Sequence, residues 1–282
     1  MAEKTRPIII SILNHKGGVG KTTTCINLGA GLARVGKRVL LIDMDAQGNL
    51  TESLGRASKE TQKTIYNAFV DEISLDDIIV PTLTHNLHFV PGSEAMAALD
   101  LTIGSTYGRE FLLRNRLSET EKLSNYDFVI IDNPPSISLA TANALVASDY
   151  YVVPLTCEYL PLIGLKLLKR SVKQLEALNP KLQSLGVLLT MYSKNEKITK
   201  KIESLVEAQL GGGVFKTRIR TNTKAKAAPI GKKTLFEFEG KRGGRGTEDY
   251  TKFTEEFLLR IDERTKAREE RNSNGATNQL IA

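Results

Sequence analysis

The sequence predicts a doubly wound α/β fold, in which helices cover both faces of a mostly parallel β-sheet. Short, continuous apolar runs, typical of strands that are buried on both faces, alternate along the chain with segments of helical periodicity. A glycine-rich turn joins the first apolar run to the first helical segment. Because sheets of this class bind ligands beyond the carboxyl ends of their strands, the polar residues that follow the strands are the first candidates for a site.

The individual elements follow from these patterns. The first strand is an apolar run between Pro7 and Asn14, and Gly36 ends the helix that comes after it. Strands are expected at residues 8–13, 38–43, 86–90, 126–132, 149–155 and 185–191. Helices are expected at residues 21–34, 162–178 and 198–210.

The chain has 282 residues, of which 41% are hydrophobic, enough for one domain with a sizeable core. We expect a single domain over residues 1–262 and a charged, polar C-terminal extension over residues 263–282, helical at first and then partly disordered. No apolar run approaches the roughly 20 residues of a bilayer-spanning helix, and the first residues do not resemble a signal peptide. The sequence therefore predicts a soluble, cytoplasmic protein.

Cysteine and histidine do not suggest a metal site. Cys25 and Cys157 are far apart and lack the spacing of metal ligands, and the three histidines form no metal-binding constellation. Cys25 falls where a helix would bury it, so we expect both cysteines to be reduced, small hydrophobic side chains.

The glycine-rich turn has the composition of a phosphate-binding loop. Gly17, Gly18 and Gly20 allow successive backbone N–H groups to turn toward one anion, and the N-terminus of the following helix points at the same place. The strict pattern G-x-x-x-x-G-K-[ST] is not met, because His15 stands in place of the first glycine.

The side chains after the glycines support the same interpretation. Lys21 can reach the β- and γ-phosphates of a nucleotide, and the Thr22 hydroxyl can ligate Mg²⁺. A turn that serves packing alone is the alternative, but here the strand, turn, lysine, hydroxyl and helix occur together. The expected nucleotide contacts are Lys16, Gly17, Gly18, Val19, Gly20, Lys21, Thr22 and Thr23.

Carboxylates follow two of the predicted strands. Asp43 and Asp45 lie two residues apart at a strand end, so their side chains share a face and can both point over the cleft. An N-cap role for Asp45 in the next helix is an alternative that does not exclude the first. Asp132 ends the most apolar strand, where a carboxylate without a partner would be costly.

The run from Lys16 to Thr22, Lys-Gly-Gly-Val-Gly-Lys-Thr, is the signature of the deviant Walker A type of P-loop NTPase, and residues 14–24 resemble its ParA/Soj family. In that family two subunits sandwich two nucleotides, so the resemblance implies an ATP-dependent homodimer with ATP and Mg²⁺ as cofactors. It also implies that Lys16 crosses to the phosphates of the partner subunit, where a second cation neutralises charge that develops during phosphoryl transfer.

Two further segments resemble motifs of this family. Residues 43–49 resemble Asp-x-Asp-Pro-Gln-x-Asn, with Ala46 in place of the proline, and residues 130–136 resemble the Walker B segment. The resemblance implies that Asp45 orients the attacking water and that Asp132 holds Mg²⁺ through water. The expected catalytic residues are Lys16, Lys21 and Asp45, and the expected metal ligands are Thr22, Asp132 and Asp45.

Basic residues are concentrated in one part of the chain. The net charge is +7, but residues 181–233 contain 12 basic and three acidic residues, a local +9, and the rest of the chain is about neutral. A localised positive field favours a polyanionic partner. The family resemblance implies that this region binds non-specific double-stranded DNA, whereas a merely solvated basic face is the alternative. The candidate DNA contacts are Lys194, Lys197, Lys200, Arg218, Arg220, Lys224 and Lys226.

The resemblance covers roughly residues 8–260, including later blocks at 214–220, 229–231 and 246–256. It implies a nucleoid-associated ATPase whose slow hydrolysis is stimulated by a ParB-like centromere-binding or adaptor protein. Such a cycle would segregate or position plasmid or chromosome DNA, and an ATPase that positions another cargo is an alternative. No helix-turn-helix domain is expected before residue 8, so we expect no operator-reading function.

Three other functions fit the loop but not the rest of the sequence. A MinD-like membrane-cycling ATPase would end in an amphipathic helix, whereas residues 268–271 read Arg-Glu-Glu-Arg and the polar tail lacks an apolar face, so no membrane partner is expected. A dethiobiotin-synthetase-like enzyme would leave the basic region unexplained. A nitrogenase-iron-protein-like reductase would need cluster cysteines that the chain lacks.

Overall fold

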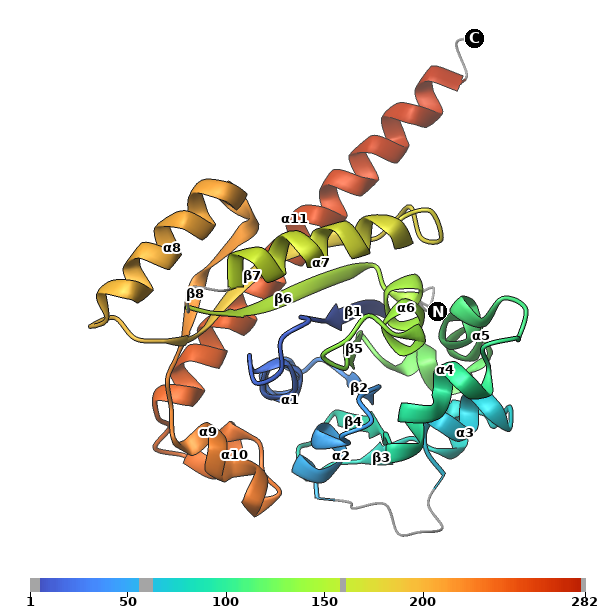
Figure 1. The fold of residues 1–282 in the computed structure, drawn as a ribbon, viewed down its shortest axis with the longest axis horizontal. Coiled ribbons are helices and arrows are strands. Elements are labelled where there is room, and N and C mark those ends of the chain that lie inside the picture. Colours follow the sequence, from blue (N-terminus) through green and yellow to red (C-terminus); the bar gives the residue numbers. More distant parts are fainter. Residues whose placement is uncertain (1–5, 56–62, 158–160, 280–282) are drawn as a thin grey trace.

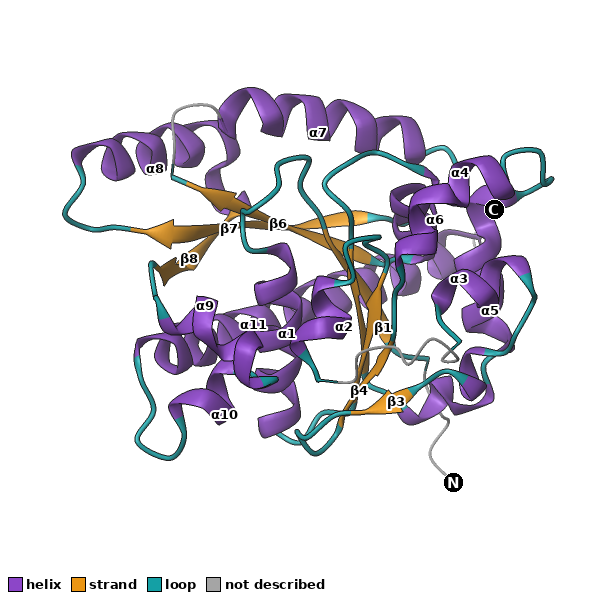
Figure 2. Cartoon of the chain, turned by 60° about the horizontal axis from the view of Figure 1, so that its bottom comes forward, coloured by secondary structure: helices purple, strands orange, loops and turns teal. Residues whose placement is uncertain are grey.

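The computed structural model describes residues 6–55, 63–157 and 161–279 (Figures 1 and 2). Residues 1–5, on which the expectation about a signal peptide depends, and residues 280–282 of the expected extension lie outside the described residues. Within the described residues, no helix has both the length and the apolar character that crossing a bilayer requires.

The strands are β1 (Ile8–Ile12), β2 (Val39–Asp43), β3 (Val80–Pro81), β4 (Leu87–Val90), β5 (Phe128–Asp132), β6 (Tyr150–Thr156), β7 (Gln183–Tyr192) and β8 (Val214–Arg220). The α-helices are α1 (Lys21–Arg34), α2 (Asn49–Ser53), α3 (Ile65–Val70), α4 (Leu99–Thr102), α5 (Leu112–Glu119), α6 (Leu139–Ala147), α7 (Pro161–Leu175), α8 (Lys197–Leu210), α9 (Lys224–Ala227), α10 (Leu235–Glu239) and α11 (Arg245–Gln279). Short 3₁₀ helices lie at Leu75–Asp77, Glu94–Ala98, Arg109–Phe111, Glu121–Asn125, Gly211–Gly213 and Ala228–Gly231.

The described strands form one sheet in the order β3-β4-β2-β5-β1-β6-β7-β8. Every neighbouring pair is parallel except β3 with β4, which is antiparallel. The predicted doubly wound, mostly parallel sheet is therefore confirmed, and all six expected strands are present. Two strands were not among the predictions: β3, which has two residues, and β8, in which charged side chains interrupt the apolar pattern.

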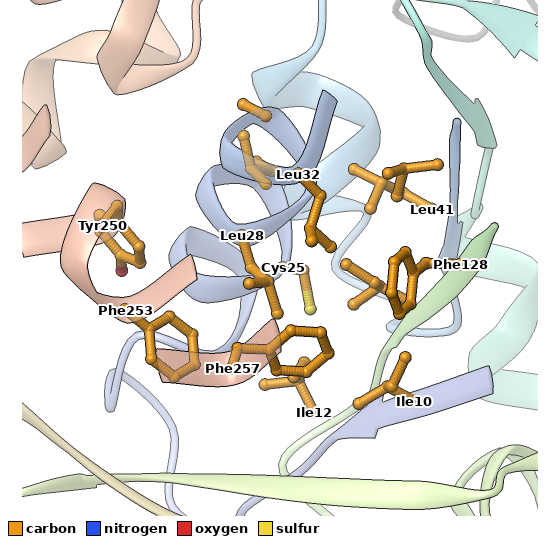
Figure 3. Packing of buried hydrophobic residues seen from close by; sticks show 14 of the residues in the cluster. Ile10, Ile12, Cys25, Leu28, Leu32, Leu41, Phe128, Tyr250, Phe253 and Phe257 are labelled. Carbon is orange, nitrogen blue, oxygen red and sulfur yellow. The ribbon is translucent and has the colours of Figure 1, made fainter. Parts of the chain in front are cut away.

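Alternate strand residues face the two layers of helices. In β1, Ile10 and Ile12 face a core that they share with α1, α10 and α11, whereas Ile9 faces the core under α3 to α6. A third cluster joins β6 and β7 to α7 and α8. Figure 3 shows α1 between the sheet and α11, with these side chains in contact: Ile10, Ile12, Cys25, Leu28, Leu32, Leu41, Phe128, Tyr250, Phe253 and Phe257.

Helix α11 packs closely against α1 along its first half. A Cβ atom added to Gly31 would lie 2.2 Å from the Thr254 hydroxyl oxygen, so glycine permits the two helices to approach. Helix α11 continues past residue 262 without a break. Its later turns project away from the sheet and the other helices (Figure 1). The proposed boundary between a domain and an extension thus falls within one helix.

The sheet brings the predicted site together at one edge. Ile12, Asp43 and Asp132 end β1, β2 and β5, and backbone register pairs Asp132 with both of the others. Because these strands are neighbours, the glycine-rich loop after β1 and the carboxylates of β2 and β5 lie at the same end of the sheet.

Candidate nucleotide-binding site

The glycine-rich loop delivers the chain into α1 with its first backbone N–H groups uncapped. Gly18 and Gly20 have φ angles of 74° and 87°, in the left-handed region that favours glycine. Helix α1 begins at Lys21, and no side chain caps its N-terminus. A Cβ atom at Gly17 or Gly18 would meet nothing within 4 Å, so this side of the loop is open. The arrangement suits an anion, which backbone N–H groups and the helix dipole would stabilise.

Asn14, which sequence analysis did not assign, anchors the start of this loop. Its buried amide nitrogen donates to the Pro154 carbonyl oxygen of β6 at 2.7 Å, and its amide oxygen accepts from the Lys16 backbone N–H at 3.0 Å. Both groups of one side chain are thereby used to fix the loop to the sheet. An asparagine between a strand and a glycine-rich turn is the only sequence signal for this role.

Lys21 is held inside the loop. The residue is only 6% exposed, and its Nζ donates a hydrogen bond to the Lys16 carbonyl oxygen at 3.2 Å. Burial lowers the Lys21 pKa, while the charges of Asp132 and Asp45 oppose that shift. An arriving phosphate would bring further negative charge to this ammonium group and so favour its charged form. Lys16, by contrast, is exposed at the surface of the loop.

Asp132 is fully buried and only partly satisfied. Its Oδ2 has no hydrogen-bond partner among the described residues, while Oδ1 lies 3.6 Å from the Cys25 sulfur and the Thr22 hydroxyl hydrogen-bonds the carboxyl group. Burial, followed by the negative charge of Asp43, raises the Asp132 pKa above its ordinary value. A buried oxygen of this kind is costly without a cation or a proton, so the site fits a metal ion.

The residues present fit Mg²⁺ better than a metal held by protein alone. No group of three or more His, Cys, Asp or Glu in the described part of the chain is arranged to hold a metal ion. Mg²⁺ commonly keeps several waters and binds through one or two carboxylates together with substrate phosphates. Thr22 and Asp132 lie where they could take part in such a site, and Asp45 is close enough to affect the pKa of Asp132.

Asp43 and Asp45 have different surroundings, although sequence analysis expected both to point over the cleft. Asp43 is fully buried and accepts hydrogen bonds from the Thr51 N–H at 2.9 Å and the Thr51 hydroxyl at 2.6 Å. The Thr51 hydroxyl in turn accepts from the Gly92 N–H at 2.9 Å. Asp43 therefore joins β2 to α2 and to the segment after β4, a role that sequence analysis missed.

Asp45 forms a local turn and does not cap α2. Its Oδ1 accepts from the Gln47 N–H at 3.1 Å, and its own N–H donates to Asp43 at 3.2 Å. The residue at the N-cap of α2 is Gly48. The N-cap alternative for Asp45 is thus wrong, and its second oxygen is not committed to that helix.

The candidate DNA contacts divide into exposed lysines and paired side chains. Lys194 precedes α8, Lys197 and Lys200 lie on α8, and Lys226 lies on α9; all four are exposed. Arg218 on β8 contacts Glu203 and Glu207 of α8, each at 2.7 Å.

The remaining two candidates also have acidic neighbours. Arg220 on β8 pairs with Glu248, at 2.7 Å, and with Asp249, both on α11. Lys224 on α9 lies 3.9 Å from Glu239. The structure therefore places Arg218 and Arg220 in contacts that hold β8 to α8 and α11, with less of their charge available to a ligand.

Comparison with known proteins identifies the family of the chain. The family model described as an AAA domain matches residues 8–184. The sporulation initiation inhibitor protein Soj of Bacillus subtilis is 40% identical over 249 residues, which cover 88% of this chain and 97% of that protein. The chromosome partitioning protein ParA of Caulobacter vibrioides is 36% identical over 257 residues, which cover 91% of this chain and 96% of that protein. The chain belongs to the Soj/ParA family.

Solved structures show the same fold with nucleotide bound. A cobyrinic acid a,c-diamide synthase of Mycobacterium smegmatis with ADP and magnesium superposes with a TM-score of 0.78 at 28% identity, covering 91% of this chain and 96% of the other. A plasmid partition protein of Borrelia burgdorferi bound to AMPPNP has a TM-score of 0.76 at 25% identity, and the match covers 90% of this chain and 99% of the other. The Soj/ParA resemblance inferred from residues 14–24 is therefore confirmed across most of the chain.

Proposed function

We propose that this Soj/ParA family member is an ATPase that dimerises with ATP, binds DNA without sequence specificity and uses hydrolysis to segregate or position plasmid or chromosome DNA. The observation that carries the proposal is the open, uncapped loop before α1, with buried Lys21 on one side and the unsatisfied Asp132 oxygen beside it. A relative of similar length that is named for chromosome partitioning, ParA of Caulobacter vibrioides, supports the wider role.

Each site residue has a separate task in this proposal. The loop N–H groups from Gly17 to Thr23 would bind the phosphates, and Lys21 would neutralise their charge. Thr22 and Asp132 would hold Mg²⁺, which supplies electrostatic stabilisation of the transferring phosphoryl group when bound. Asp45 would orient the attacking water from its turn after β2.

Lys16 is suited to act on the second subunit. It is exposed at the loop surface, whereas Lys21 already occupies the interior of its own loop. A second copy that met this face would receive the Lys16 ammonium group near its phosphates, so that nucleotide binding and dimer formation would be coupled. A ParB-like partner would act on the same dimer by stimulating hydrolysis.

The exposed lysines favour DNA as the polyanion. Lys194 follows β7, and Lys197 and Lys200 lie on α8. Lys194 also lines a groove of 410 Å³, together with Lys216, Arg218, Arg220, Lys252, Glu248 and Asp249. Flexible, exposed lysines bind phosphates without reading bases, which gives salt-sensitive affinity for any sequence.

Co-sedimentation with DNA and with anionic vesicles tests this proposal against the membrane-cycling alternative. The chain should sediment with duplex DNA of arbitrary sequence in Mg²⁺ and ATP, much less with ADP, and not with vesicles. Equal sedimentation with DNA in ATP, ADP and no nucleotide would contradict the proposal. Vesicle binding that requires ATP would favour the alternative.

A further inference from the structure

The phosphate loop is bonded to β7, a strand that sequence analysis did not connect with it. The hydroxyl group of Thr190 donates to the carbonyl oxygen of Val19 at 2.8 Å, across 171 positions of sequence. Thr190 and Val19 are 3% and 1% exposed, so water does not compete for this bond. A Cβ atom at Gly20 would lie 4.0 Å from the Thr190 methyl group, which therefore supports the back of the loop.

This bond orients a peptide that faces the nucleotide site. The carbonyl group of Val19 and the N–H of Gly20 belong to one planar trans peptide, so they point in opposite directions. When Thr190 draws the Val19 oxygen toward β7, the Gly20 N–H is turned away from β7. In phosphate loops of this kind, backbone N–H groups at this place cradle the phosphates.

The neighbouring strand shows that the sheet does not require such a bond. Thr156 of β6 is the register partner of Thr190 and is equally buried, at 2% exposure. Its hydroxyl oxygen has no hydrogen-bond partner among the described residues. Two similarly buried threonines at one level of the sheet thus differ in whether the hydroxyl group bonds to the loop.

We propose that Thr190 is a positioning residue of the nucleotide site, whose hydroxyl group holds the Val19–Gly20 peptide in the orientation that binds phosphate. The loop then does not depend on its glycines alone: Asn14 fixes its start to β6 and Thr190 fixes its end to β7. Without the Thr190 hydroxyl, the Val19 carbonyl would be buried without a donor, and the peptide would rotate to seek one.

The test is the affinity for ATP with Mg²⁺, measured by titration of the wild-type chain and matched variants. Thr190→Val keeps the shape of the side chain and removes the donor, so it should weaken ATP binding by roughly tenfold. Thr156→Val makes the same change one strand away and should bind ATP as the wild type does. Thr190→Ser keeps the hydroxyl group and should restore most of the affinity.

Two results would overturn the inference: wild-type affinity in Thr190→Val, or equal losses in the Val variants of Thr190 and Thr156. If Thr190→Val does not fold, Thr190→Ser and Thr190→Ala decide the question, because they differ only by the hydroxyl group. Ser should then bind ATP roughly tenfold more tightly than Ala, and equal affinities would refute the role.

The inference rests on the nucleotide-binding part of the proposed function, and the same titration separates the two. A wild-type chain that does not bind ATP with Mg²⁺ would refute both. A wild-type chain that binds, together with a Thr190→Val variant that binds equally well, would refute only the role of Thr190.

Discussion

Asp43 and Asp132 lie side by side at the ends of two neighbouring parallel strands, and both carboxyl groups are fully buried. Asp43 is satisfied by Thr51, whereas one oxygen of Asp132 has no partner among the described residues. Burial raises the pKa of both groups, and the negative charge of Asp43 raises that of Asp132 further. Because two buried carboxylates repel each other, the pair favours a cation, which could also contact the phosphates of a bound nucleotide.

The first prediction concerns pH and the stability of the metal-free chain. Because the Asp132 pKa is raised above its ordinary value of 3.8, the folded chain holds this proton more tightly than the unfolded chain does. Between the two pKa values, the free energy of unfolding should fall by up to about 1.4 kcal/mol for each unit of rising pH. Asp132→Asn should remove this contribution and flatten the profile.

Denaturant unfolding from about pH 5 to about pH 8, without nucleotide or Mg²⁺, measures this effect. The wild type should lose stability toward the higher pH more steeply than Asp132→Asn. Parallel profiles would show that Asp132 does not carry an unfavourable charge in the folded chain. The same variant should lose Mg²⁺-dependent ATP hydrolysis.

The second prediction separates binding from hydrolysis. Asp45→Ala removes the carboxylate that would orient water but leaves the loop and its contacts with Asn14 unchanged. ATP affinity should stay within a few-fold of the wild type, while the single-turnover rate of phosphate release should fall by about 10²-fold or more. A variant that hydrolyses at the wild-type rate would exclude Asp45 from this role.

The third prediction tests the packing of α1 on α11. In Gly31→Ala the new methyl group would lie 2.2 Å from the Thr254 hydroxyl oxygen and 3.2 Å from the Thr254 Cβ. Rotating the threonine would move the hydroxyl group away but would leave the close contact with Cβ. The free energy of unfolding should fall by about 1–3 kcal/mol. Thr254→Ala in the same chain should recover part of the loss, which thermal unfolding would show. Equal stability of Gly31→Ala and wild type would contradict the close approach of the helices.

The fourth prediction distinguishes lysines that bind DNA from arginines that hold the fold. Lys197→Ala and Lys200→Ala should weaken DNA binding and have little effect on stability. The plot of log affinity against log salt concentration should become less steep, its negative slope losing about 1 in magnitude for each phosphate that the variant no longer neutralises. Arg218→Ala breaks two contacts with α8 and should lower the free energy of unfolding by about 1–2 kcal/mol. Binding titrations at several salt concentrations, paired with unfolding curves, measure both effects. A loss of DNA affinity in Arg218→Ala with unchanged stability would reverse this assignment.

The sequence predicted the parts of this molecule that depend on local pattern. The buried runs before Asn14, Asp45 and Asn133 identified the central strands, and the spacing of glycine, lysine and threonine identified the loop. Strand β8 was not predicted because it pairs at an irregular register and carries charged side chains that interrupt its apolar pattern. Its place in the sheet depends on β7 and α11, which no local pattern reveals.

The contacts that bring Gly92 and Thr190 to the site join distant parts of the chain. Thr51 and Asp43 are separated by few residues, but their partner Gly92 lies after another strand, and Thr190 reaches Val19 from the far half of the chain. A threonine in a strand is ordinarily taken as a residue that suits the pleated surface. Only the fold shows which threonine hydroxyls meet the site.

The most direct test of the proposed function is an equilibrium titration of a labelled duplex of arbitrary sequence, followed by fluorescence anisotropy in Mg²⁺ with ATP or with ADP. The non-hydrolysing Asp45→Ala variant should bind the duplex at least about tenfold more tightly with ATP than with ADP, and Lys21→Ala should show no such difference. If Asp45→Ala binds the duplex equally with ATP, with ADP and without nucleotide, the site before α1 does not control DNA binding and the proposed function is wrong.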